Sequence, residues 1–87
     1  MNAPEVEEVD ADEWEGVRWV DVLYRWKVEQ LRWPCSLGLR VFSGGRVTVM
    51  GVCSPKLEYI PEMEQVATEH ARAHVMPKLQ AEATEKP

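Results

Sequence analysis

Long apolar runs are absent from this chain of 87 residues. No stretch reaches the roughly 18 consecutive apolar residues that a membrane-spanning helix needs. Residues 1–5 contain one acidic residue, Glu5, and no basic residue, whereas a secretory signal peptide begins with basic residues and continues with apolar ones. We therefore expect a soluble cytoplasmic protein with no role at a membrane.

Cysteine and histidine are scarce. Cys35 and Cys53 are the only cysteines, and two cysteines define no disulfide framework. We expect two reduced thiols, as is usual in the cytoplasm, with a disulfide as the alternative. His70 and His74 are four residues apart, which places them on one helical face, but no compact Cys-x2–4-Cys ligand spacing accompanies them. The sequence thus predicts no metal site and indicates no cofactor.

Basic residues are absent from residues 1–15, which carry seven acidic side chains. The whole chain has 10 basic and 15 acidic residues, so residues 16–87 hold 8 acids and a net charge of +2. A run of like charge without apolar periodicity is typical of disorder. We predict a disordered acidic arm over 1–15, a single small α+β domain over 16–77 and a frayed tail over 78–87.

Apolar and polar side chains alternate from residue 20 to residue 29, which predicts a half-buried strand over about 18–32. The same segment also fits one face of a helix, and an α-β-β-α fold with residues 17–33 helical is the alternative. A helix would leave Trp19, Trp26 and Trp33 on a second, partly exposed face. The abundance of valine, tyrosine and tryptophan also favours the strand.

Two further strands, about 37–43 and 46–53, flank the pair Gly44-Gly45, which predicts a two-residue hairpin turn. The predicted pairs are Val41 with Thr48, Leu39 with Met50, and Leu37 with Val52. Pro61 is suited to the first turn of a helix over about 62–76, and Pro77 is expected to end that helix. The predicted fold is a three-stranded antiparallel meander packed by one C-terminal helix.

The predicted outer face of this sheet mixes basic and apolar side chains. A tight turn at Pro34 would pair Arg32 with Leu37, and the residues that then share the outer face are Arg25, Lys27, Arg40, Phe42, Val47 and Val49. A fully solvated face should be polar. Three interpretations compete: the acidic arm covers this face with Trp14 and Trp19, a protein partner docks there, or nucleic acid lies across it.

No arrangement of residues indicates catalysis, and no small-molecule substrate is indicated. Neither histidine lies in a signature that ties it to a nucleophile, and Gly44-Gly45 is not followed by the lysine and helix of a phosphate-binding loop. We expect a non-catalytic protein-binding module (a regulator, inhibitor or adaptor) that acts by steric occlusion.

The expected partner is another protein, with a second copy of this chain as one candidate. The predicted contact residues are Phe42, Val47, Val49, Arg40, Trp19 and Trp33, since aromatic residues and arginine favour interface cores. The alternative is a nucleic-acid-binding domain that uses Arg25, Lys27, Arg40 and Phe42, with the acidic arm as an autoinhibitory competitor.

Overall fold

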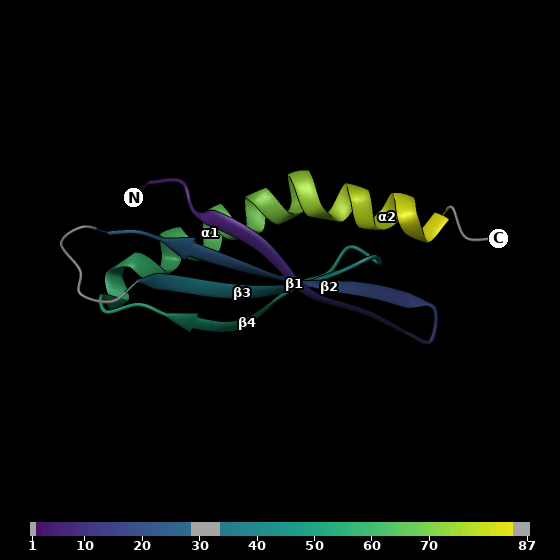
Figure 1. Cartoon of the computed structure of the whole chain (residues 1–87), viewed down its shortest axis with the longest axis horizontal. Helices are drawn as coiled ribbons and strands as arrows, with labels where there is room; N and C mark the ends of the chain where they lie inside the picture. The colour runs from purple at the N-terminus through teal and green to yellow at the C-terminus, as the bar shows by residue number, and fades with distance from the viewer. Residues whose placement is uncertain (1, 29–33, 85–87) are drawn as a thin grey trace.

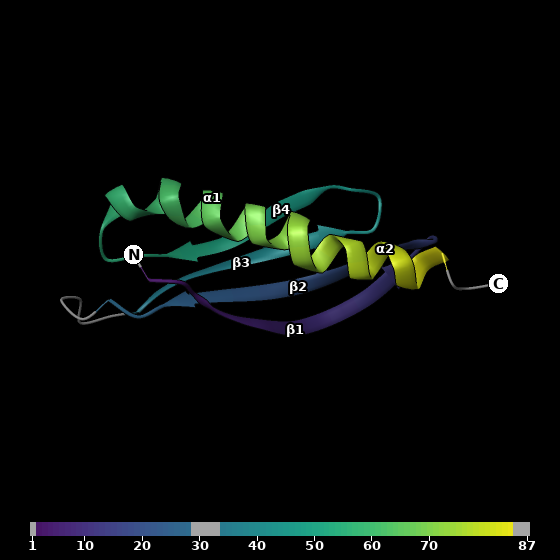
Figure 2. The ribbon, with the colours of Figure 1, turned by 90° about the horizontal axis from the view of Figure 1, so that it is seen from above.

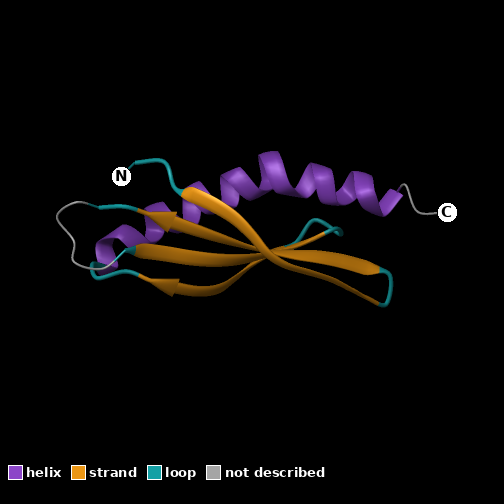
Figure 3. Cartoon of the chain, viewed as in Figure 1, coloured by secondary structure: helices purple, strands orange, loops and turns teal. Residues whose placement is uncertain are grey.

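The protein is a four-stranded antiparallel sheet with one helical segment packed across one of its faces (Figure 1, Figure 3). The computed structural model describes residues 2–28 and 34–84. The elements are β1 (Glu5–Trp14), β2 (Val17–Trp26), β3 (Cys35–Phe42), β4 (Val47–Cys53), the 3-10 turn η1 (Leu57–Tyr59), α1 (Ile60–His70), the π-helical turn η2 (Ala71–Val75) and α2 (Met76–Thr84). The α+β class is as predicted, but the sheet has four strands where the sequence predicted three.

Strand β1 is formed by residues for which the sequence predicted a disordered arm, and that prediction is wrong for residues 5–14. The strand pairs with β2 from Glu5 opposite Arg25 to Trp14 opposite Val17. Glu15 and Gly16, with φ values of 49° and 82°, make the two-residue turn between the strands. Pairing with β2 satisfies the backbone, and cations from β2 and α2 offset the charge that suggested disorder.

Strand β2 confirms the interpretation of residues 17–26 as a strand and excludes the helical alternative there. Its register with β3 differs from the prediction, because Leu37 lies opposite Tyr24 and not opposite Arg32. The prediction assumed a tight turn at Pro34. Strand β2 instead ends at Trp26, so the connection to Cys35 is longer and the register shifts accordingly. Residues 29–33, which include Trp33, lie outside the described part of the chain.

The hairpin between β3 and β4 has a three-residue loop where a two-residue turn was predicted. The Phe42 N–H donates to the Arg46 carbonyl at 2.8 Å, the Gly45 N–H donates to the Phe42 carbonyl at 3.0 Å, and Gly45 has a φ of 107°. This is a type I turn closed by a glycine with positive φ. One extra loop residue moves each β4 side chain near the turn to the opposite face.

The β3–β4 register corrects two of the three predicted pairs. Val41 lies opposite Val47 and Leu39 opposite Val49, whereas Leu37 lies opposite Val52 as predicted. A β-bulge leaves Met50 without a partner between Val49 and Gly51. The longer loop shifts the register of β4 by one residue from the predicted one, and the bulge shifts it back by one residue. The observed and predicted registers therefore agree again at Val52.

The helical segment continues through Pro77, where the sequence predicted that it would end. The Met76 N–H donates to the carbonyl of Ala71, five residues earlier, which widens the helix just before the proline. This π-helical turn accommodates a proline ring that would otherwise clash with the carbonyl four residues earlier. Residues 78–84 are thus helical rather than a frayed tail, and Leu79 is only 7 % exposed.

The hydrophobic core lies between the helix and the two central strands. Seen from above, the helix crosses the sheet obliquely, with α1 over the β3–β4 side and α2 over β2 (Figure 2). The buried side chains are Val20, Val22, Tyr24, Trp26, Cys35, Leu37, Leu39, Val41, Met63, Ala67, Ala71, Val75, Met76 and Leu79. Among the described residues, no helix is both long and apolar enough to cross a membrane.

Candidate interaction surface

The face of the sheet that points away from the helix, here called the outer face, carries an aromatic cluster at one end. Alternation along β2 and β3 directs Trp19 and Phe42 to this face, where they are opposite one another. The turn between β1 and β2 adds Trp14 and Val17, which pair with each other at the end of the ladder. These four residues and Arg46 form what we call the outer-face cluster.

The outer-face cluster surrounds a shallow hollow and is open to solvent. The cluster residues and Glu15 line this hollow of about 450 Å³. Trp14 is 74 % exposed and Val17 is 42 % exposed, whereas Trp19 and Phe42 are partly buried. Exposed apolar side chains gathered in one place mark an interaction surface more often than scattered ones do.

Two guanidinium groups stack on the aromatic rings of this face. Arg46 lies 4.7 Å from the centroid of the Phe42 ring, and Arg40 lies 3.9 Å from that of Trp19. Arg40 also donates two hydrogen bonds to Asp21, at 2.8 and 2.9 Å. The hydrogen bond to Asp21 is the main reason that the pKa of Arg40 is raised. Arg46 has no such ion pair within the described residues, so its charge is available to a partner.

The other cations of the outer face are matched by acids of β1. Arg25 contacts Glu7 at 2.9 Å, and Lys27 lies 3.7 Å from Glu5. Together with the Arg40–Asp21 pair, this means that each basic residue predicted for nucleic-acid binding already has a carboxylate partner. The outer face therefore lacks a continuous basic track.

The structure brings together only part of the predicted partner-binding set. Trp19, Phe42 and Arg40 are neighbours on the outer face, as the prediction requires. Val47 and Val49 lie on the helix side, opposite Val41 and Leu39, so the prediction of their position is wrong. Trp33 lies outside the described residues.

The sequence interpretation did not include Trp14, Val17 and Arg46 among the contact residues. The signal that could have found the first two is Gly16, which is suited to a tight turn with Trp14 and Val17 at its two ends. The high acidic content of residues 1–15 obscured this signal. The position of Arg46 depends on the length of the β3–β4 loop, which the sequence did not define.

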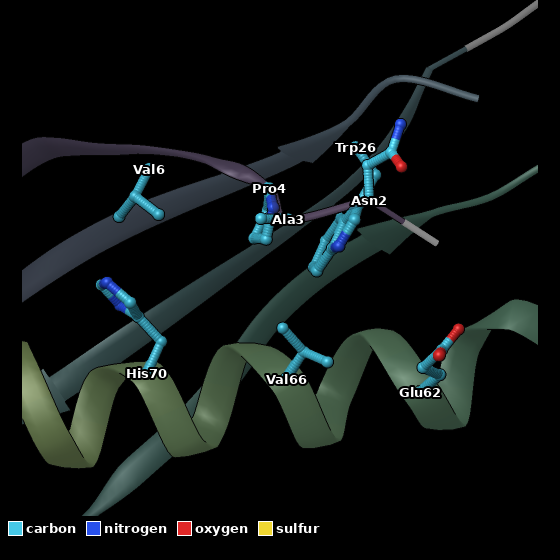
Figure 4. Close-up of a pocket in the computed structure, with 8 residues that line it drawn as sticks. All are labelled: Asn2, Ala3, Pro4, Val6, Trp26, Glu62, Val66 and His70. Carbon is cyan, nitrogen blue, oxygen red and sulfur yellow. The ribbon is translucent and has the colours of Figure 1, made fainter. Parts of the chain in front are cut away.

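A second hollow, of about 410 Å³, lies on the helix side between the N-terminal segment and α1 (Figure 4). Its lining is mostly apolar and consists of Asn2, Ala3, Pro4, Val6, Trp26, Glu62, Val66 and His70. His70 points from α1 toward the sheet, and its Nδ1 lies 2.9 Å from the Tyr24 hydroxyl. We call this hollow the β1–α1 groove.

Burial favours the neutral forms of Tyr24 and His70 beside the β1–α1 groove. Burial, with a smaller contribution from Glu8, raises the pKa of Tyr24 to about 12. Burial, with a smaller contribution from His74, lowers the pKa of His70. The ring centroids of His70 and His74 lie 4.9 Å apart, which is why the charge of His74 contributes to the lowered pKa of His70. A neutral hydrogen-bonded pair of this kind stabilises the packing of helix on sheet.

The thiols and imidazoles do not converge on a metal site in the described residues. Cys35 is buried, with its Sγ 3.7 Å from the Ser54 hydroxyl oxygen, and Cys53 is exposed. Both are free thiols. Within residues 2–28 and 34–84, no group of three or more His, Cys, Asp or Glu side chains is arranged to hold a metal ion.

Comparison with protein-family models, curated proteins and solved structures finds no match to this chain. The fold and the outer-face cluster are therefore the basis for a functional proposal.

Proposed function

We propose that the protein is a small non-catalytic module that binds a protein partner through the outer-face cluster. The observation that carries this proposal is the grouping of exposed Trp14 and Val17 with Trp19 and Phe42 around one hollow. Tryptophan and arginine dominate the energetic centres of protein interfaces. The cluster combines both with a concave shape that an inserted side chain can fill.

The chemistry of the outer-face cluster defines the kind of segment that it accepts. The hollow offers apolar contact from Trp14, Val17 and Phe42, which suits an aromatic or branched aliphatic anchor. Arg46 lies at the same hollow and stacks on Phe42, so a carboxylate next to the anchor would gain a charge-assisted hydrogen bond. Binding would occlude the partner's segment from other proteins, which is how a regulator, inhibitor or adaptor of this size acts.

Charge favours a protein partner over nucleic acid. Strand β1 directs Glu5, Glu7, Asp10 and Asp12 to the outer face, beside the cations of β2 and β3. A phosphate backbone approaching Arg25, Lys27 or Arg40 would have to displace these carboxylates or lie beside them. Nucleic-acid binding therefore remains the second candidate, without a feature of the outer face that favours it.

The test is capture of partners from the native lysate, with and without nuclease, using wild-type protein and matched variants. Trp14→Ala and Arg46→Glu remove the anchor contact and the charge, and each should reduce the captured partner by about tenfold or more if the residue is an interface centre. Leu57→Ala, at a side chain that is 80 % exposed away from the cluster, is the control and should leave capture unchanged.

Two results would contradict the proposal. One is a partner that Trp14→Ala and Arg46→Glu still capture at wild-type levels while far-UV circular dichroism shows an intact fold. The other is a partner that disappears after nuclease treatment, which would promote the nucleic-acid alternative. Direct titration with a labelled single-stranded oligonucleotide at low salt then decides between the two classes.

A further inference from the structure

The two edges of the sheet differ sharply in charge. Six of the ten residues of β1 are acidic, and the strand is interrupted by a bulge at Val9, between Glu8 and Asp10. Charges and bulges are devices that keep an edge strand from pairing with other chains. Strand β4, at the other edge, has the sequence VTVMGVC and carries no charged residue. Its only such device is the bulge at Met50.

The backbone of β4 presents unpaired groups along its free side. Phe42 and Arg46 form a hydrogen-bonded pair at the loop, and such pairs alternate with non-bonded pairs along an antiparallel ladder. By this alternation the next bonded pair is Arg40 with Thr48. The N–H and C=O groups of Val47 and Val49 therefore point away from β3, toward the free edge.

The side chains of β4 are as exposed as its backbone. Val49, Met50 and Val52 are 42 %, 53 % and 41 % exposed, although Val49 and Val52 belong to the apolar side of the sheet. The helix covers β2 and β3 more fully than it covers this edge. A strand added beside β4 would bury these side chains and satisfy the outward backbone groups at the same time.

We propose that the protein forms a symmetric dimer in which β4 pairs antiparallel with β4 of a second copy. The two sheets then become one eight-stranded sheet, with both helices on one face and both outer-face clusters on the other. This surface differs from the outer-face cluster, so the inference does not rest on the proposed function.

The absence of charge on β4 makes a second copy of the chain a suitable occupant of this edge. An uncharged strand can pair with itself without placing like charges opposite one another. The acidic β1 strands would lie at the two far edges, separated by seven inter-strand spacings of about 4.8 Å, or about 34 Å. Because the Debye length at physiological salt is about 8 Å, the net charge of −5 on each copy does not oppose the contact.

The experiment measures the mass of the full chain in solution by light scattering over a concentration series, with Val49→Lys and Val6→Lys as a matched pair. Both valines lie on edge strands, on the helix side of the sheet, and are 42 % and 40 % exposed. Wild type and Val6→Lys should approach twice the monomer mass of 10.0 kDa. Val49→Lys places a cation in each half of the interface and should raise the dimer dissociation constant about tenfold or more.

Hydrogen exchange on the wild-type chain provides a readout that requires no substitution. The Val47 and Val49 amides should become more protected as the concentration rises, because only dimerisation gives these outward N–H groups a partner. A mass of 10.0 kDa that persists up to roughly 1 mM would overturn the proposal, since even a millimolar dissociation constant would show dimer there. Equal dissociation of the two lysine variants, or unchanged exchange at Val47 and Val49, would also overturn it.

Discussion

At the scale of single residues, the contact between Tyr24 and His70 joins the sheet to the helix. Burial raises the pKa of the tyrosine to about 12 and lowers that of the histidine, so it favours the neutral form of both groups. The 2.9 Å distance between the Tyr24 hydroxyl and Nδ1 of His70 gives each buried polar atom a partner. The helix therefore rests on the sheet through a polar contact as well as through apolar packing.

The lowered pKa of His70 predicts that stability falls in mild acid. Between the folded pKa and 6.5 the unfolded chain binds more protons than the folded protein, so the contribution of His70 is complete above pH 6.5 and is lost as the pH falls through the folded value. His70→Gln keeps a hydrogen-bonding side chain but does not titrate. Urea unfolding above and below pH 6.5 should show a weaker pH dependence for His70→Gln than for wild type.

His74→Gln is the control for this measurement. His74 is exposed and affects His70 only through its charge, so this variant should retain most of the wild-type pH dependence. If His70→Gln and wild type lose stability equally in acid, the Tyr24–His70 contact does not contribute to the pH dependence.

At the scale of elements, β1 shows how a charged segment becomes a strand. Six acidic residues repel one another, but pairing with β2 satisfies the backbone, and cations from β2 and α2 balance part of the charge. Lys78 of α2 lies 3.1 Å from Glu8, which connects β1 to the helix as well. Exposed ion pairs of this kind contribute only about 0–1 kcal/mol each, so backbone pairing is the larger factor.

The turn at Glu15-Gly16 provides a test of whether β1 belongs to the folded unit. Gly16 has a φ of 82°, where an alanine costs roughly 1–2 kcal/mol. Gly16→Ala should therefore reduce the free energy of unfolding by about 1 kcal/mol and accelerate hydrogen exchange in β1. Gly44→Ala is the matched control, because Gly44 does not have a positive φ and an added Cβ meets nothing within 4 Å. Equal stability of the two variants would favour a loosely attached arm.

At the scale of the whole molecule, one core connects the sheet to the helix, and no described element has a core of its own. The side chains of β2 and β3 contact the stripe of small and flexible residues on the helix, including Met63, Ala67 and Ala71. Small residues allow the helix to lie close to the sheet. We therefore expect the sheet and the helix to unfold in one cooperative transition.

Leu39→Ala tests this cooperativity. Leu39 is fully buried, and truncation of such a leucine typically costs about 2–5 kcal/mol. Far-UV circular dichroism and tryptophan fluorescence should both report the loss, with the same midpoint in urea. Leu57→Ala removes the same atoms from a side chain that is 80 % exposed and should change stability by less than about 0.5 kcal/mol. Midpoints that differ between the two probes would contradict a single folding unit.

The sequence by itself determined which side chains of the central strands face the core. Alternation along residues 20–26 and 37–41 indicated the buried face that Tyr24 and Leu39 occupy, and the helix after Pro61 was also predictable. The same alternation directed Trp19, Arg40 and Phe42 to the outer face. These features follow from the periodicity of apolar side chains. That periodicity depends on the geometry of one strand or helix, so it can be recognised in a single continuous stretch of sequence.

Only the tertiary structure decided how the segments are matched to one another. Strand β1 exists because β2 supplies hydrogen bonds and cations to an acidic segment, and the helix passes Pro77 because a π-helical turn makes room for the ring. The face occupied by Val47 and Val49 depended on one extra loop residue at Gly45. The register between strands, and which strands pair with one another, depend on loop conformation and on contacts between residues distant in the sequence. The periodicity of a single strand or helix does not contain that information.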